Sequence, residues 1–98
     1  MSLGELLRDE RTRKGFGLNQ LADRIGISPA YLSRVETGKL GNTPSEELRG
    51  KLATELGLGH DEVCRLARRI PSDVECYVLD NPGVLKRLRR EMNRRSAS

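Results

Sequence analysis

The stretch LADRIGISPAYLSRVETGK, which begins at Leu21, constrains the fold more than any other part of the chain. Leu21 and Ile25 are four residues apart, so they lie on the same face of a helix. Gly26 permits the left-handed backbone that reverses a chain within a few residues. Ser28 is a favoured helix N-cap, and Pro29 suits the first helical position. The stretch therefore predicts two short helices joined by a glycine turn, which is a helix-turn-helix.

The second helix of this pair, residues 29–37, has an inward and an outward side. Leu32 and Val35 are three residues apart and face the body of the domain. A helix presented in this way has the shape that enters the major groove of DNA. The alternative is an ordinary corner between two bundle helices. Small and apolar residues at the turn, such as Ala22 and Ile27, disfavour that alternative.

The rest of the chain contains further signals for helix starts and ends, and no stretch in which apolar and polar residues alternate as in a strand. The sequence therefore indicates an all-α protein. Helices are expected over residues 3–14, 18–26, 29–37, 44–56, 60–69 and 82–94, with a further short helix opened by a cap at Ser72. Two of these starts are predicted from capping boxes, Thr43 to Glu46 and Ser72 to Glu75. With three aromatic residues and no tryptophan, the core must consist mainly of Leu, Ile, Val and Ala. Pro71 is expected to close a five-helix unit.

The same residues carry a family resemblance. The stretch closely resembles the core of the Cro/repressor-like helix-turn-helix regulators, also called the xenobiotic-response-element family. Its members commonly read L-A-x-x-x-G-[IV]-S-x-x-[YT]-[IL]-S-x-[IL]-E-x-G. The match extends back to Arg11 and forward through PSEELRGKLATELGL. The resemblance implies a five-helix lambda-repressor-like DNA-binding domain, residues 1–70, followed by a two-helix C-terminal extension, residues 71–98.

Two positions depart from the family pattern. Many members begin the first helix of the motif with a Gln that holds a DNA phosphate, whereas Leu18 stands at that place here. The backbone N–H groups after Gly17 remain available to a phosphate. Pro29 and Ala30 stand where many relatives carry Gln, Lys or Ser. Polar base reading at the front of the second helix is therefore reduced.

The outward side of residues 29–37 supplies the expected DNA contacts. Arg34 is expected to make the main base contact, because its planar guanidinium fits O6 and N7 of guanine. The other expected base contacts are Tyr31, Ser33 and Ala30, and the expected phosphate contacts are Ser28, Thr37, Lys39 and Asn42. Tyr31 can equally be read as a half-buried core aromatic, and Arg34 as a solvated surface residue. A solvated loop is the alternative for Lys39 and Asn42.

Glu36 is negative on a helix that is expected to approach phosphates. The family resemblance implies that it pairs with Arg11 on the first helix, which neutralises the carboxylate and ties the two helices together. The net charge of the whole chain is +4. Residues 1–58 contain nine basic and eight acidic residues, and residues 59–98 contain nine and six, giving +1 and +3. This balance suits a nucleic-acid binder.

Three residues raise the question of a metal site. His60 and Cys64 are four residues apart, and Cys76 could supply a third ligand. No fourth ligand is evident and Cys64 suits a core position, so neither a metal nor a cofactor is expected. The cysteines of a chain without an export signal are expected to be reduced thiols. With no apolar run long enough to cross a membrane, the protein is expected to be cytoplasmic.

The last two helices carry more apolar surface than a short hairpin can hide. The residues expected to make a dimer are Val74, Tyr77, Val78, Val84, Leu85 and Leu88. This surface must either fold back on residues 60–69 or pair with a second subunit. The opposite side of the final helix is basic, with Lys86, Arg87, Arg89, Arg90, Arg94 and Arg95.

The leading hypothesis is a transcriptional repressor that binds double-stranded DNA as a homodimer on a palindromic operator. A single domain of this size makes few contacts, and a two-fold dimer reads two half-sites. The alternative is an antitoxin-type interaction module, whose tail neutralises a toxin protein and whose DNA binding controls its own operon. An enzyme is not expected, because the chain has one histidine and no plausible pair of nucleophile and base.

Overall fold

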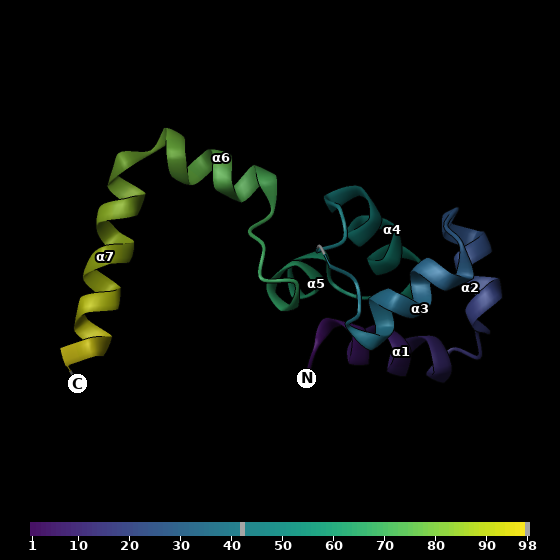
Figure 1. Ribbon diagram of the computed structural model, residues 1–98. Coiled ribbons are helices and arrows are strands. Elements are labelled where there is room, and N and C mark those ends of the chain that lie inside the picture. The colour runs from purple at the N-terminus through teal and green to yellow at the C-terminus, as the bar shows by residue number, and fades with distance from the viewer. Residues whose placement is uncertain (42, 98) are drawn as a thin grey trace.

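The computed structural model describes residues 1–41 and 43–97, and α-helices are the only regular elements within those ranges. They are α1 (Leu3–Arg13), α2 (Leu18–Ile25), α3 (Pro29–Thr37), α4 (Glu46–Leu56), α5 (His60–Leu66), α6 (Ser72–Asp80) and α7 (Pro82–Ala97). Helices α1 to α5 form a compact body, and α6 and α7 form a bent pair of helices, called the hairpin below, that stands away from it (Figure 1). The radius of gyration is 16.4 Å, against about 13 Å for a compact chain of this length. The expected all-α class is confirmed.

The core of the body lies where α1, α2, α3 and α4 meet. Each of these helices contributes a leucine with no exposed surface, namely Leu7, Leu21, Leu32 and Leu52. Burying one such side chain stabilises the fold by roughly 1.5–3 kcal/mol. Helix α5 closes the body with buried Val63 and Cys64. The body therefore has a core of its own without the hairpin.

The helix-turn-helix forms as the sequence indicated. Gly26 has φ 78° and ends α2. The Ser28 hydroxyl then accepts the Tyr31 N–H at 3.1 Å and starts α3. Gly38, with φ 73°, ends α3 after Thr37. These bounds agree with the expected ones because the cap and turn residues at both ends of α3 fix them locally.

The two predicted capping boxes are wrong. Helix α4 begins at Glu46, and Ser45 is its N-cap, accepting the Leu48 N–H at 3.2 Å. Pro44 lies buried before the helix, where its carbonyl accepts a hydrogen bond from the Arg49 guanidinium at 2.6 Å. Helix α6 begins at Ser72 itself, and its N-cap position is a proline that makes no side-chain bond.

The ends of α5 and α7 also differ from the expected ones. Helix α5 ends at Leu66, three residues early, because Arg68 adopts a left-handed φ of 62°. The Arg69 N–H then donates to the Cys64 carbonyl at 2.9 Å, a helix-ending bond that usually accompanies glycine. No glycine marks this place in the sequence. Helix α7 continues to Ala97, past the expected end at residue 94.

Gly4, a residue to which the sequence analysis gave no role, sets the distance between α1 and α3. A Cβ added at Gly4 would lie 2.8 Å from the carbonyl carbon of Glu36 and would meet its oxygen still more closely. Both atoms belong to the backbone of α3, so neither can move aside as a flexible side chain would. Close crossing of the two helices therefore requires glycine at this position.

Gly4→Ala is expected to lower the free energy of unfolding by about 1–3 kcal/mol, because the added methyl group forces α1 away from α3. Urea denaturation followed by circular dichroism measures the change. Gly50→Ala on α4 is a matched control, since its Cβ would lie 3.8 Å from the nearest atom, in the His60 ring. That variant should be more stable by up to about 1 kcal/mol through helix propensity. Equal stability of the Gly4 variant and the wild type would contradict the close approach of α1 and α3 at this position.

Candidate nucleic-acid interface

Helix α3 presents one side to the core and the other to solvent. Leu32, Val35 and Glu36 are buried on the inner side. Ala30 and Arg34 are exposed on the outer side. The inner and outer sides are the expected ones, because the spacing of Leu32 and Val35 gives α3 a single apolar side that can pack on the body. The outer side is open to a large ligand.

Arg34 lies on the outer side of α3. Within the described residues, neither a hydrogen bond nor an ion pair holds its side chain, so the guanidinium is free to meet a partner. Ser33 is half-buried, and its carbonyl accepts a hydrogen bond from the Thr37 hydroxyl at 2.9 Å. The Thr37 oxygen can still accept a bond, but its proton is used within the helix.

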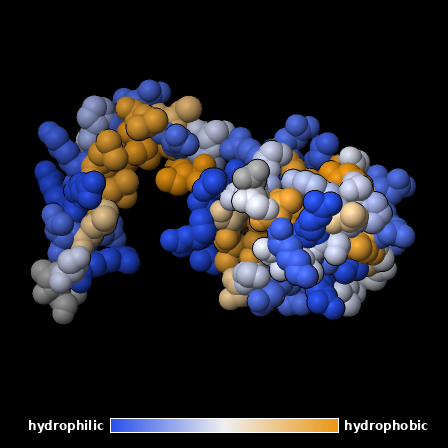
Figure 2. Space-filling view, in the orientation of Figure 1, coloured by the Kyte–Doolittle hydropathy of each residue, from blue (hydrophilic) through white to orange (hydrophobic). Residues whose placement is uncertain are grey.

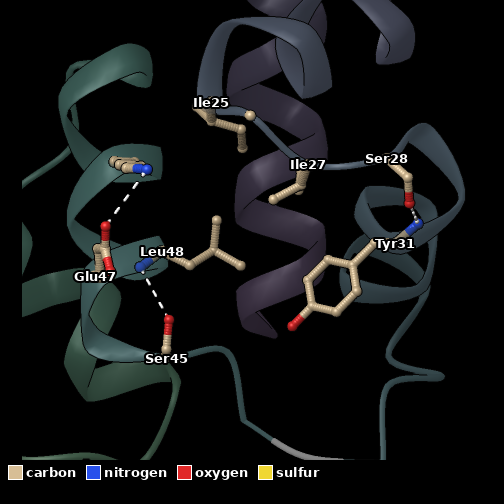
Figure 3. A pocket seen from close by; sticks show the side chains of 9 residues that line it. Ile25, Ile27, Ser28, Tyr31, Ser45, Glu47 and Leu48 are labelled. Carbon is tan, nitrogen blue, oxygen red and sulfur yellow. Dashed lines mark hydrogen bonds and ion pairs between the residues drawn. The ribbon is translucent and has the colours of Figure 1, made fainter.

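Tyr31 packs against the core rather than extending into solvent. Its half-buried ring lines a hollow of about 410 Å³ between the turn after α2 and the start of α4. In Figure 3 the ring points across this hollow toward Leu48 and Ser45. The geometry fits the core-aromatic interpretation that the sequence left open.

The residues that flank α3 differ in how their polar groups are used. The Ser28 oxygen accepts the N–H that starts α3, so its hydroxyl proton remains available to a phosphate. Lys39 is exposed just after the helix. Asn42, the fourth expected phosphate contact, lies outside the described residues. At the start of α2, the Gly17 N–H donates to the Gln20 side chain at 3.3 Å, so that one group is occupied.

Arg8 is a cation that sequence reasoning did not select. It is exposed on α1 and lines a hollow of about 250 Å³ together with Ser33 and Thr37 of α3. A basic side chain from the first helix therefore lies beside the outer side of the second helix of the motif. No local signal could find it, since the spacing of α1 does not tell which flank borders α3.

Arg11 and Glu36 form the ion pair that the resemblance implied. The Arg11 Nε donates to Glu36 Oε2 at 2.7 Å, and Nη2 donates to Oε1 at 3.0 Å. The third donor, Nη1, reaches the Phe16 carbonyl at 2.9 Å. The hydrogen bond to Glu36 raises the pKa of Arg11 above its ordinary value, against the effect of burial. The pair joins α1, α3 and the connection before α2, and it neutralises the carboxylate.

The residues considered for a metal site are only partly brought together. His60 Nε2 lies 3.5 Å from the sulfur of buried Cys64, whereas Cys76 is exposed on α6. In the described part of the chain, His, Cys, Asp and Glu side chains do not gather in groups of three or more that could hold a metal. Among the same residues, every helix is too short or too polar to span a membrane.

Comparison with known families decides the assignment. Residues 2–66, more than half of the chain, match the helix-turn-helix domain family. The chain belongs to this family. Its relatives are named as transcriptional regulators, and its fold is that of helix-turn-helix proteins of the Cro/repressor type.

Two relatives of this chain come from Bacillus subtilis (strain 168). The chain is 41% identical to the HTH-type transcriptional regulator SlrR over 54 residues, covering 55% of this chain and 35% of that protein. It is 33% identical to the HTH-type transcriptional repressor RghR over 87 residues, covering 81% of this chain and 64% of that protein. The chain thus spans about a third of the first relative and less than two-thirds of the second.

Solved structures show the same architecture. The regulator SinR in complex with DNA is 28% identical, with a TM-score of 0.57 over 62% of this chain and 95% of that chain. The clp gene regulator ClgR from Corynebacterium glutamicum is 28% identical, with a TM-score of 0.57 over 96% of this chain and 84% of that chain. The latter match includes the hairpin as well as the body.

Proposed function

We propose that this regulator represses transcription by binding a palindromic DNA operator as a homodimer. The observation that carries the proposal is the outer side of α3. There Arg34, whose side chain has no hydrogen-bond or ion-pair partner among the described residues, lies opposite buried Leu32 and Val35. A helix held in this way by a rigid body can enter the major groove and present one guanidinium to base edges. The SinR structure that this body resembles contains DNA.

The proposed contacts divide into base reading and phosphate binding. Arg34 reads guanine, while Ala30 and Ser33 lie close enough on α3 to touch neighbouring bases. The phosphate contacts come from Ser28 and Lys39, which flank the helix, and from Arg8 on α1. Thr37 joins them when its hydroxyl proton turns from the Ser33 carbonyl to the phosphate. Tyr31 contributes mainly by packing. Phosphate contacts of this kind fix the position of the protein on the duplex but do not select sequence.

The hairpin is proposed to make the dimer. Most of its large apolar side chains remain exposed in the single chain, with Tyr77 59%, Leu85 45% and Leu88 46% accessible, whereas Val78 and Val84 are half-buried. Figure 2 shows this apolar patch over α6 and the adjoining part of α7. The hairpin does not cover the patch by packing on the body, and patches of this kind mark association sites in soluble proteins.

Charge favours a second copy as the occupant of this patch. Helix α6 carries three acidic residues and no basic residue, whereas α7 carries six basic residues and one acidic residue. A two-fold axis that places α6 beside α7 of the partner subunit brings helices of opposite net charge together twice, while the basic side of α7 stays outside the apolar contact. Residues 1–70 then form the DNA-binding unit, and residues 71–98 form the dimerisation unit.

The direction of control is proposed from one relative. RghR, which matches 81% of this chain, is named as a transcriptional repressor. A dimer bound across a palindrome represses when it obstructs the polymerase. The antitoxin-type alternative is not favoured, because both curated relatives are named as transcriptional regulators.

Leu88→Lys is expected to convert the full-length chain from dimer to monomer, because it places a charge in the centre of the apolar patch. Analytical ultracentrifugation measures the change. Asn93→Lys adds the same charge to α7 at an exposed polar position and should leave the dimer intact. A wild-type chain that stays monomeric at high concentration, or a Leu88 variant that stays dimeric, would contradict the proposed interface.

A further inference from the structure

The start of α6 is capped by a residue from another helix. Pro71 occupies the N-cap position and makes no side-chain hydrogen bond. The Ser72 N–H instead donates to Glu46 Oε2 at 2.9 Å, and the Ser72 hydroxyl donates to Oε1 at 2.8 Å. Glu46 is the first residue of α4. One carboxylate therefore lies at two helix N-termini, where the partial positive charge of each helix favours an anion.

The surroundings of Glu46 hold this carboxylate in its charged form. The pKa of Glu46 is lowered first by the Ser72 hydroxyl and then by the Ser72 N–H, with Arg49 and His60 adding attraction. Arg49 is 5% exposed and is anchored by its bond to the Pro44 carbonyl. The cap of α6 is thus built on a rigid part of the body.

Little else fixes the hairpin to the body. The connecting segment contains Arg68 in a left-handed conformation, and Arg68, Arg69 and Ile70 are all exposed. Ile70 is 62% accessible, so it gives little packing. Among the described residues, the two bonds between Glu46 and Ser72 are consequently the main polar restraint on the direction in which α6 leaves the body.

We infer that Glu46 is a positioning residue for DNA binding, which fixes the hairpin and thereby the separation of the two α3 helices in the dimer. The inference rests on the proposed function, since it needs dimerisation through the hairpin. A dimer with a fixed separation binds one spacing of half-sites best. A dimer whose hairpins swing freely binds several spacings about equally. Its affinity for DNA is lower, because binding must also offset the conformational entropy lost when the hairpins become ordered.

Two variants remove the cap in different ways. Glu46→Ala removes the acceptor, and Ser72→Pro removes both donors while placing proline at a helical position that favours it. Glu47→Ala is the matched control, because Glu47 is the next residue of α4 and pairs only loosely with Lys51, at 3.6 Å. The control removes the same charge without touching α6, so it accounts for any general effect of charge on DNA affinity.

The probe is a set of duplexes in which the half-site that the wild-type chain enriches from a random pool is repeated at different spacings. The wild type and Glu47→Ala should prefer one spacing. Glu46→Ala and Ser72→Pro should lose that preference and bind the best duplex at least about fivefold more weakly. Binding to a single half-site and dimerisation should stay unchanged. Variants that keep the wild-type spacing preference would overturn the inference.

Hydrogen exchange tests the cap without DNA and separates the two proposals. The amides in the first turn of α6 should exchange faster in Glu46→Ala than in the wild type and in Glu47→Ala. Unchanged exchange would overturn the inference whatever the DNA result. If the first turn of α6 exchanges faster in Glu46→Ala but the wild-type chain shows no preferred spacing of half-sites, the cap is real and the dimer geometry of the proposed function is refuted.

Discussion

Glu36→Gln is expected to lower the free energy of unfolding by about 3–5 kcal/mol, because it breaks a largely buried ion pair. The side chain of Glu36 is 5% exposed and that of Arg11 is 14% exposed. The substitution leaves the Arg11 guanidinium without its counter-charge in a place that water barely reaches. Urea denaturation followed by circular dichroism measures the loss.

The control for this prediction is a surface pair with similar geometry. Glu62 and Arg65 approach to 2.6 Å, but their side chains are 49% and 67% exposed. Glu62→Gln should therefore cost less than about 1 kcal/mol. Equal losses for the two variants would show that the Arg11–Glu36 pair is no better shielded than a surface pair. The role proposed here for Glu36, holding α3 against α1, would then be refuted.

Arg34→Ala is expected to reduce discrimination between operator and random DNA by about 1–3 kcal/mol per half-site. The side chain is exposed and forms no bond within the described residues, so its loss leaves the fold intact. Because a dimer carries two copies, the effect on the intact operator is about twice as large. Fluorescence anisotropy with a selected duplex and a scrambled duplex measures the ratio of affinities.

Lys39→Ala is the matched control for Arg34→Ala. It removes a cation just after the C-terminal end of α3, where a phosphate contact is proposed. Binding to both duplexes should weaken by a similar factor, and the ratio of affinities should stay constant. The same pattern for Arg34→Ala would make Arg34 a phosphate contact. An unchanged affinity for both duplexes would place it outside the interface.

The parts of the fold that could be predicted from the sequence are those bounded by cap and turn residues. Gly26, Ser28 and Gly38 act within a few residues of where they stand, so the bounds of α3 could be predicted closely. The start of α4 could not, because Thr43 and Ser45 are both good caps. In the folded body Ser45 is the cap, and the Pro44 carbonyl accepts a hydrogen bond from the Arg49 side chain, a contact that no local sequence signal indicates.

The parts that escaped prediction depend on contacts between distant segments. Gly4 matters because of the Glu36 backbone on another helix, and α6 starts at Ser72 because Glu46, 26 residues away, caps it. Arg68 ends α5 without the glycine that usually signals such an end. For the candidate site, spacing separated the two sides of α3 correctly. It could not decide whether the Tyr31 ring would face inward or outward.

Selection of bound duplexes from a random pool by the wild-type chain tests the central claim most directly. We expect enrichment of an inverted repeat with a guanine in each half-site. The two half-sites should be centred about 10 base pairs apart, which is one helical turn, or a multiple of that distance. Enrichment without inverted symmetry would contradict the homodimer, and no enrichment over the starting pool would contradict sequence-specific binding itself.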